Sequence, residues 1–211
     1  MRPLQNSGTK QGTAGLPLPF AGVDETGRGC LAGPVVAAAV VLPQTFDLPF
    51  LDDSKKLTPL QRLKLEKAVK AQAESWAVGI SWPREIDRLD ILQASLLAMC
   101  RAVQRLKISP RSVIVDGNQK MPMALPQRCI VGGDGLIPAI SAASIIAKTY
   151  RDRLMDVLHN RYPGYALSEH KGYGTRVHLR ALATLGPSPI HRRSFKGVLP
   201  LREKRVWLPG I

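Results

Sequence analysis

Residues Phe20 to Leu42 read FAGVDETGRGCLAGPVVAAAVVL, and this stretch decides the fold. Phe20 to Asp24 is a short apolar run that predicts a buried strand, and Pro34 to Leu42 is a longer, β-branched run that predicts a second one. The glycines between them predict a turn, so the folded part begins like a hairpin near Phe20. Residues 1–19 are rich in Gly, Pro, Thr, Gln and Asn without an apolar period, and we expect them to form a flexible N-terminal tail.

The rest of the chain alternates between predicted helices and strands. Thr58-Pro59 supplies the N-cap and first-turn signals of a helix, and Gly186-Pro187 is typical of a helix end. The pattern predicts helices at 58–74, 83–107 with a break near Leu89, 137–159 and 176–185, and strands at 75–82, 112–116 and 128–131. We expect one α/β domain over residues 20–195, followed by a C-terminal tail at 196–211.

The charge of the chain narrows the class of partner. Its 211 residues include 30 Lys and Arg against 16 Asp and Glu, which gives a formal net charge of +14. This balance attracts a polyanion, and nucleic acid is the first candidate; a generally basic surface is the alternative. From 148 to 206 there are 13 Lys and Arg against 4 Asp and Glu, so we expect a binding face in the C-terminal third.

The cysteines and the apolar runs indicate the compartment. Three widely spaced cysteines without a Cys-x-x-Cys pair predict neither a disulfide framework nor a zinc site. The longest clean apolar run, Val35 to Leu42, is far shorter than a membrane span. We expect a cytoplasmic protein with no membrane association, a monomer whose protein partners the sequence leaves open.

Four carboxylates lie at the ends of predicted strands. Asp24 and Glu25 end the first strand, and Asp116 and Asp134 follow two later ones. The carboxyl ends of strands are where α/β sheets hold ligands, so we expect these side chains to meet, with the Gly-rich turn letting the first two converge. Oxygen donors select Mg²⁺ or Mn²⁺ over zinc, and an acidic cluster in a basic protein favours two-metal phosphodiester hydrolysis. A lone Asp-Gly such as Asp116-Gly117 would otherwise be a turn.

Other residues suggest how a nucleic acid would be read. The backbone of Gly27-Arg28-Gly29 can approach a ribose 2′-OH closely, although this motif alone is also typical of a tight turn. Tyr173 lies between glycines and is suited to stacking on a sugar or base, with a core tyrosine as the alternative. Lys148 and Lys171 are candidate phosphate contacts, unless they are simply solvated.

A metal-free ribonuclease would need a pair of histidines as acid and base. All four histidines lie in the C-terminal third, and we expect them at the surface or against phosphates. They are His159, His170, His178 and His191.

Taken together, these segments resemble bacterial ribonuclease HII. The resemblance spans roughly residues 20–195. It rests on the motifs Ala21–Pro34, Asp52–Thr58, Val115–Asn118, Gly133–Asp134, Ser141–Lys148, Arg151-Asp152 and Tyr162–Thr175.

What the resemblance implies is an RNase H-like fold, a mixed five-stranded sheet flanked by helices with a helical C-terminal extension. It implies metal-binding roles for Asp24, Glu25, Asp116 and Asp134. It also implies 2′-OH recognition by Gly27, Arg28 and Gly29 and deoxyribose sensing by Tyr173. The family cuts on the 5′ side of a ribonucleotide in duplex DNA, leaving 3′-hydroxyl and 5′-phosphate ends, and cuts RNA in RNA–DNA hybrids. Roles in ribonucleotide excision repair and primer removal follow from this activity.

Thr26, Cys30 and Ala166-Leu167 differ from the usual family residues, yet none of these changes removes a predicted ligand.

Two other classes of protein fit the sequence less well. A non-catalytic binding protein on the same scaffold should have lost a carboxylate. Ribonuclease HI lacks the adjacent acid pair, and ribonuclease HIII carries an additional N-terminal domain for which 19 residues are too short.

Overall fold

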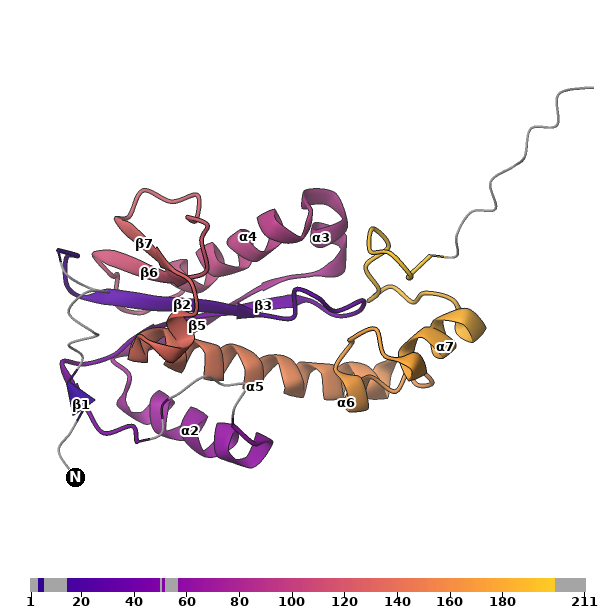
Figure 1. The fold of residues 1–211 in the computed structure, drawn as a ribbon, viewed down its shortest axis with the longest axis horizontal. Helices are drawn as coiled ribbons and strands as arrows, with labels where there is room; N and C mark the ends of the chain where they lie inside the picture. The colour runs from indigo at the N-terminus through magenta and orange to yellow at the C-terminus, as the bar shows by residue number, and fades with distance from the viewer. Residues whose placement is uncertain (1–3, 6–14, 50, 52–56, 200–211) are drawn as a thin grey trace, which may run out of the picture.

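The computed structural model describes residues 4–5, 15–49, 51 and 57–199. Its centre is a mixed five-stranded sheet, as predicted, and the strand order is β5-β3-β2-β6-β7 (Figure 1). β2 pairs antiparallel with β3 and parallel with β6, β3 pairs antiparallel with β5, and β6 pairs parallel with β7. The strands are β2 (Phe20–Thr26), β3 (Val35–Val41), β5 (Ser75–Ser81), β6 (Ser112–Asp116) and β7 (Gln127–Ile130).

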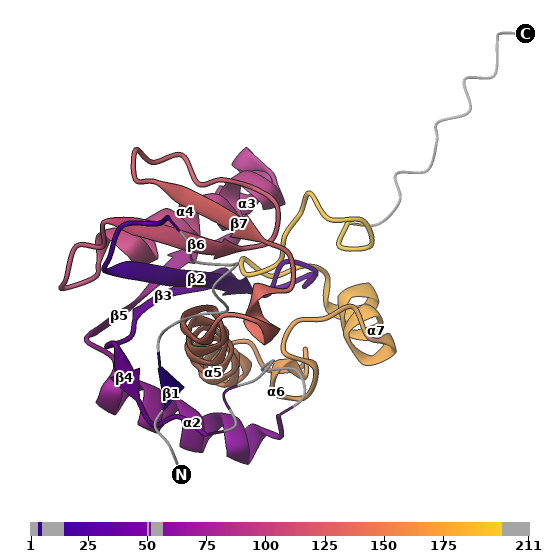
Figure 2. The same ribbon diagram turned by 60° about the vertical axis from the view of Figure 1, so that its left-hand side comes forward.

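Helices cover both faces of this sheet. One face carries α3 (Pro83–Leu89) and α4 (Ile91–Gln104), and the other carries α5 (Pro138–Arg161) with α2 (Pro59–Gln72) outside it (Figures 1 and 2). The short helix η1 (Gly133–Gly135) precedes α5. The C-terminal extension, α6 (Leu167–His170) and α7 (Arg176–Leu185), lies beyond the end of the sheet. No helix within the described ranges combines the length and apolarity needed to span a bilayer.

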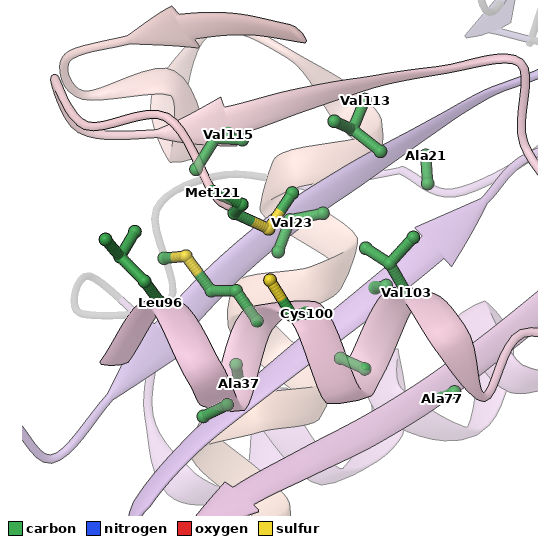
Figure 3. Packing of buried hydrophobic residues seen from close by; sticks show 14 of the residues in the cluster. Ala21, Val23, Ala37, Ala77, Leu96, Cys100, Val103, Val113, Val115 and Met121 are labelled. Carbon is green, nitrogen blue, oxygen red and sulfur yellow. The ribbon is translucent and has the colours of Figure 1, made fainter. Parts of the chain in front are cut away.

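The burial of β3 shows why its sequence is apolar throughout. Alternate residues of a strand face opposite sides, and both sides are covered here, so neither set can be polar. The set that packs toward α4 joins the cluster drawn in Figure 3, and the other set packs toward α5. These sets are Val35, Ala37, Ala39 and Val41, and Val36, Ala38 and Val40.

Gly22 lets α5 lie directly on β2. A Cβ at this position would stand 2.2 Å from the carbonyl carbon of Ala139 and 2.4 Å from the backbone nitrogen of Ile140. The glycine is therefore needed for close approach of helix and strand. This approach brings the first turns of α5 to the strand that carries the predicted acids.

Local signals set the helix boundaries. The Thr58 hydroxyl accepts from the Gln61 backbone and the Gln61 side chain accepts from the Thr58 backbone, the capping box that starts α2. The predicted break near Leu89 is real: Asp90 has a φ of 75° and its carboxylate caps α4 at Gln93.

The fold extends on both sides of the predicted domain limits. β1 (Leu4–Gln5), inside the predicted tail, pairs antiparallel with β4 (Thr45–Phe46), and the carbonyl of Pro17 accepts a hydrogen bond from the Ser112 hydroxyl. At the other end, Val198 is buried. Residues 1–3, 6–14 and 200–211 of the two tails, and 52–56 of the Asp52–Thr58 motif, lie outside the described residues.

A third apolar cluster joins the C-terminal extension to the loop that follows β2. Leu31 and Ala32 of this loop pack with Met155 of α5 and Leu182 of α7. Ile190 and Val198 complete the same cluster. The extension is therefore held against the Gly-rich segment rather than against the sheet.

Candidate active site

Asp24 and Glu25 lie inside β2, not in the turn after it. Both residues are paired with β3, at Ala38 and Ala37. Because neighbouring strand residues point to opposite faces, Asp24 faces α5 and Glu25 faces α4. The expectation that a glycine turn brings them together is therefore wrong: the strand separates the two side chains by its thickness. Asp24 is buried, and its Oδ1 accepts a hydrogen bond from the backbone of Glu25 at 2.7 Å.

Asp116 lies beside Asp24 on the neighbouring strand. β2 and β6 run parallel with Val23 opposite Val115, so the next residues, Asp24 inside β2 and Asp116 at the end of β6, lie on the same face of adjacent strands. The Asp116 Oδ1 accepts from the Gly133 backbone at 2.7 Å. This bond ties the end of β6 to η1.

Asp134 follows Gly133 in η1 and is buried. Its carbonyl accepts a hydrogen bond from the Ser141 hydroxyl in the first turn of α5. Through Gly133 its backbone lies next to Asp116. Asp134 thus reaches the edge where β2 and β6 end, as predicted, although the carboxylates are not drawn into one compact group.

The predicted acids of the site influence the pKa of one another. Burial raises the pKa of Asp24 well above its usual range, and the charges of Glu25 and Asp116 raise it further, whereas a hydrogen bond from Ser144 lowers it. Burial also raises the pKa of Glu25, although Arg28 opposes this effect. Three of the predicted acids therefore repel one another, and a bound cation would relieve that repulsion.

The donor set fits a hard divalent cation in its chemistry. It consists of carboxylate oxygens, which Mg²⁺ and Mn²⁺ prefer. Within the described part of the chain, however, no three His, Cys, Asp or Glu side chains lie close enough together to hold a metal ion. Asp24, Glu25, Asp116 and Asp134 would be the residues that hold it, and their side chains would have to converge to do so.

The Gly27-Arg28-Gly29 loop continues directly from these acids. Arg28 is half exposed, and its Nη1 donates to Glu25 Oε1 at 3.3 Å. Gly27 has a φ of +90°, and a Cβ there would stand 2.1 Å from the Arg151 Nε, so only glycine fits. Glu25, Arg28 and Asp116 line a cleft of about 100 Å³ with apolar residues of α4, among them Leu96. This places the loop beside the acids, as predicted.

Tyr173 lies on the other side of the same loop. Tyr173 is 44% exposed, so part of this residue is accessible to a ligand. Burial of the remainder raises the pKa of Tyr173, and so does the Cys30 thiol, to which its hydroxyl is hydrogen-bonded. Behind the ring, the neighbouring carbonyl of Gly172 accepts from the backbone of Leu31 at 2.8 Å. The tyrosine segment is therefore joined to the glycine loop by main-chain bonds.

Lys148 and Lys171 each form an ion pair with an acid of α5. Lys148 pairs with Asp152 at 2.6 Å, and Lys171 pairs with Asp156. Both line a groove of about 390 Å³ between α2 and α5, and none of the four predicted acids lines that groove.

Sequence reasoning missed several residues that support the site. Ser144 belongs to a motif quoted for the resemblance, but its contact with Asp24 became visible only in the fold. Two arginines of the basic C-terminal third, Arg151 and Arg192, are fully buried and donate to backbone carbonyls. The expectation for the histidines is wrong for His178 and His191, which are buried and bonded to each other.

Known proteins match both the sequence and the fold. The sequence model described as Ribonuclease HII matches residues 21–198. Ribonuclease HII of Nitratidesulfovibrio vulgaris is 55% identical over 198 residues, which cover 89% of this chain and 90% of that protein. Ribonuclease H2 of Pyrococcus horikoshii is 26% identical, with a TM-score of 0.71 over 85% of this chain and 94% of that one. RNase HII of Archaeoglobus fulgidus, solved in its complex with PCNA, is 25% identical, with a TM-score of 0.70 over 89% and 98%.

Proposed function

The chain belongs to the ribonuclease HII family and is a ribonuclease H-type hydrolase, and from this premise we propose that it cuts the phosphodiester on the 5′ side of a ribonucleotide embedded in duplex DNA. The RNA strand of an RNA–DNA hybrid is the second substrate. The products carry 3′-hydroxyl and 5′-phosphate ends. Removal of single ribonucleotides and of RNA primers is the role that this activity would serve.

One observation carries the proposal: Asp24 and Glu25 inside β2 and Asp116 at the end of β6 lie close enough to repel one another, in a protein of net charge +14. A buried group of like charges is costly unless a cation shares the site. A polyanionic substrate would meet the acids only with such cations present. We propose Mg²⁺ or Mn²⁺ as the cofactor, held by Asp24, Glu25, Asp116 and Asp134.

These ions would lower the pKa of an attacking water and stabilise charge on the leaving oxygen. The protein itself orients the acids. Ser144 donates to Asp24 and the Gly133 backbone donates to Asp116, so hydrogen bonds hold both carboxylates. Arg28 contacts Glu25 at the mouth of the cleft, where it would also meet a phosphate.

Selectivity for ribose would come from the two segments beside the acids. The backbone of Gly27, Arg28 and Gly29 would contact the 2′-hydroxyl, and the exposed face of Tyr173 would stack on the adjoining deoxyribose. Lys148 and Lys171 would contact phosphates farther along the duplex.

The histidines give little support to a metal-free mechanism. His170 stacks on His178 with ring centroids 4.4 Å apart, and His178 Nε2 lies 3.0 Å from His191 Nε2. Burial lowers the pKa of His178, and it lowers the pKa of His191 to about 4. An acid–base pair needs access to substrate and a pKa near the working pH, and this buried pair has neither.

Asp116→Asn tests the role of the acids. It should abolish cleavage of a ribonucleotide-containing duplex while leaving the melting temperature and duplex affinity close to wild type. Asp47→Asn, a change of the same charge at an exposed position after β4, is the matched control and should retain full activity. Full turnover by Asp116→Asn would remove that residue from the active site, and a complete loss of duplex binding would make it structural.

A further inference from the structure

The segment after α7 packs near two parts of the chain that we propose contact the substrate. They are the Gly27-Arg28-Gly29 loop and the segment that carries Tyr173, and we call them the reading segments. Ala32 and His191 form an isolated antiparallel bridge. On either side of it, the Gly33 backbone donates to Ile190 at 2.8 Å and the Arg192 backbone donates to Leu31 at 2.9 Å. Two consecutive residues, His191 and Arg192, thus lie against the loop that follows β2. We call this pair the clip.

The Arg192 side chain binds the glycine loop from inside the protein. Its Nη2 donates to the Gly27 carbonyl at 2.6 Å, its Nη1 to the Arg28 carbonyl at 2.7 Å, and its Nε to the Gly33 carbonyl at 3.0 Å. The guanidinium is fully buried. A planar group with fixed donors holds three carbonyls in one geometry, which a lysine cannot do. Burial lowers the pKa of Arg192 to about 10, so it remains charged at neutral pH.

The His191 side chain acts on the tyrosine segment through His178. The Tyr173 carbonyl can only accept, so the His178 Nδ1 that lies 2.9 Å away carries a proton. In a neutral ring, His178 Nε2 is then an acceptor, and His191 Nε2 donates to it at 3.0 Å. The remaining nitrogen, His191 Nδ1, accepts from the Ser188 backbone at 3.0 Å. Every proton in this chain of bonds therefore has one position.

We propose that the clip positions Gly27-Arg28-Gly29 and Tyr173 relative to each other, and thereby sets selectivity for a ribonucleotide joined to DNA. His191 and Arg192 are positioning residues, since neither side chain reaches the exposed site. The proposal rests on the proposed function, because it assumes that these two segments contact the substrate. Its structural part, that one pair of residues holds both segments, can be tested separately.

The first test compares Arg192→Met with Arg192→Lys. Single-turnover rates are measured on a DNA duplex with one ribonucleotide and on an RNA–DNA hybrid, with affinity for an all-DNA duplex measured beside them. Misplacing a reading segment should reduce cleavage of the single-ribonucleotide duplex by about 100-fold in Arg192→Met, with a smaller loss on the hybrid and no loss of duplex affinity. Arg192→Lys keeps the charge but not the three bonds, and should recover only part of the rate.

Arg101→Met is the control, because Arg101, like Arg192, donates a hydrogen bond to a backbone carbonyl. Arg101 donates to the Ile80 carbonyl at 2.7 Å, between α4 and β5, and contacts neither reading segment. It should retain the wild-type ratio of the two rates even where its melting temperature falls. An equal loss in Arg101→Met and Arg192→Met, or equal losses on both substrates, would reduce Arg192 to a stabilising residue and overturn the proposal.

The second test uses the order of protons at His191. His191→Gln keeps an N–H donor near the position of Nε2, whereas His191→Leu keeps none. Discrimination between the two substrates should therefore be higher in His191→Gln than in His191→Leu. Equal discrimination in the two variants would show that the hydrogen bond to His178 does not position Tyr173.

Hydrogen exchange separates failure of the clip from failure of the proposed function. In Arg192→Met, amide protection should fall in peptides covering 27–33 and 170–175 and stay unchanged in β3 and α4. Unchanged protection of both segments would overturn the clip even where wild-type protein cleaves the duplex. If wild-type protein fails to cleave, the proposed function fails, while the exchange experiment still decides whether the clip holds the two segments.

Discussion

Gly22→Ala should damage both the fold and the site, although it adds a single methyl group. The new Cβ would lie 2.2 Å from the Ala139 carbonyl carbon, and ordinary contact begins at 3.4 Å, so α5 must move by about 3.4 − 2.2 = 1.2 Å or β2 must bend. Overpacking of this kind costs about 1–3 kcal/mol, which exceeds the roughly 0.4–1 kcal/mol that alanine contributes by restricting the unfolded chain. The melting temperature should fall by about 2–4 °C for each kcal/mol lost.

The same movement would separate Ser144 on α5 from Asp24 on β2. A displacement near 1 Å in a catalytic arrangement costs about 100-fold in rate, so cleavage should fall far more than the folded fraction does. Thermal unfolding and single-turnover cleavage at a temperature well below the transition measure the two effects. Gly29→Ala, where a Cβ meets nothing within 4 Å, is the control for stability. Wild-type melting and cleavage in Gly22→Ala would refute the argument that β2 and α5 must touch for the site to form.

Three further variants test the electrostatics and the reading of substrate. Asp24→Asn should abolish cleavage yet raise the melting temperature in chelator at neutral pH. Burial raises the pKa of Asp24 in the folded protein, so ionisation of this carboxyl destabilises the fold at any pH above the ordinary Asp pKa. The difference between the variant and wild type should shrink as pH falls below the raised pKa and vanish at the ordinary one. An unchanged melting temperature at every pH would contradict this. Ser144→Ala removes the hydrogen bond that favours the charged form of Asp24. Because loss of a residue that orients a metal ligand typically costs about 10- to 100-fold, cleavage should slow by that factor. Wild-type rates at all metal concentrations would argue against this role of Ser144. Tyr173→Ala should weaken discrimination at an RNA–DNA junction more than affinity for duplex DNA, and equal losses on all substrates would make Tyr173 structural.

The sequence predicted the sheet well because its signals are local. The apolar runs of β2 and β3, the Thr58 cap and the strand that ends at Asp116 each depend on adjacent residues, and the structure confirms them. The side-chain directions of Asp24 and Glu25 were predicted wrongly. The glycines after them suggested a turn, but pairing with β3 continues through Thr26, and a strand sends neighbours to opposite faces.

The supporting residues could not be predicted from local signals. A sequence gives no indication that an arginine in a basic segment is buried, and Arg192 meets the carbonyls of Gly27 and Arg28 only after most of the chain has folded between them. The same holds for His178 and His191, whose contact depends on the path of the chain after α7. Long-range packing decides these positions, and it leaves no periodic trace in the sequence.

The most direct test of the account is cleavage of an end-labelled DNA duplex with one internal ribonucleotide, in Mg²⁺, in Mn²⁺ and in chelator, beside an all-DNA duplex of the same sequence. We expect a metal-dependent cut immediately 5′ of the ribonucleotide, leaving a 3′-hydroxyl, with no cut in the control. Tight binding without a cut would contradict it and favour a non-catalytic binding protein, and a cut that persists in chelator would contradict the role given to the four acids.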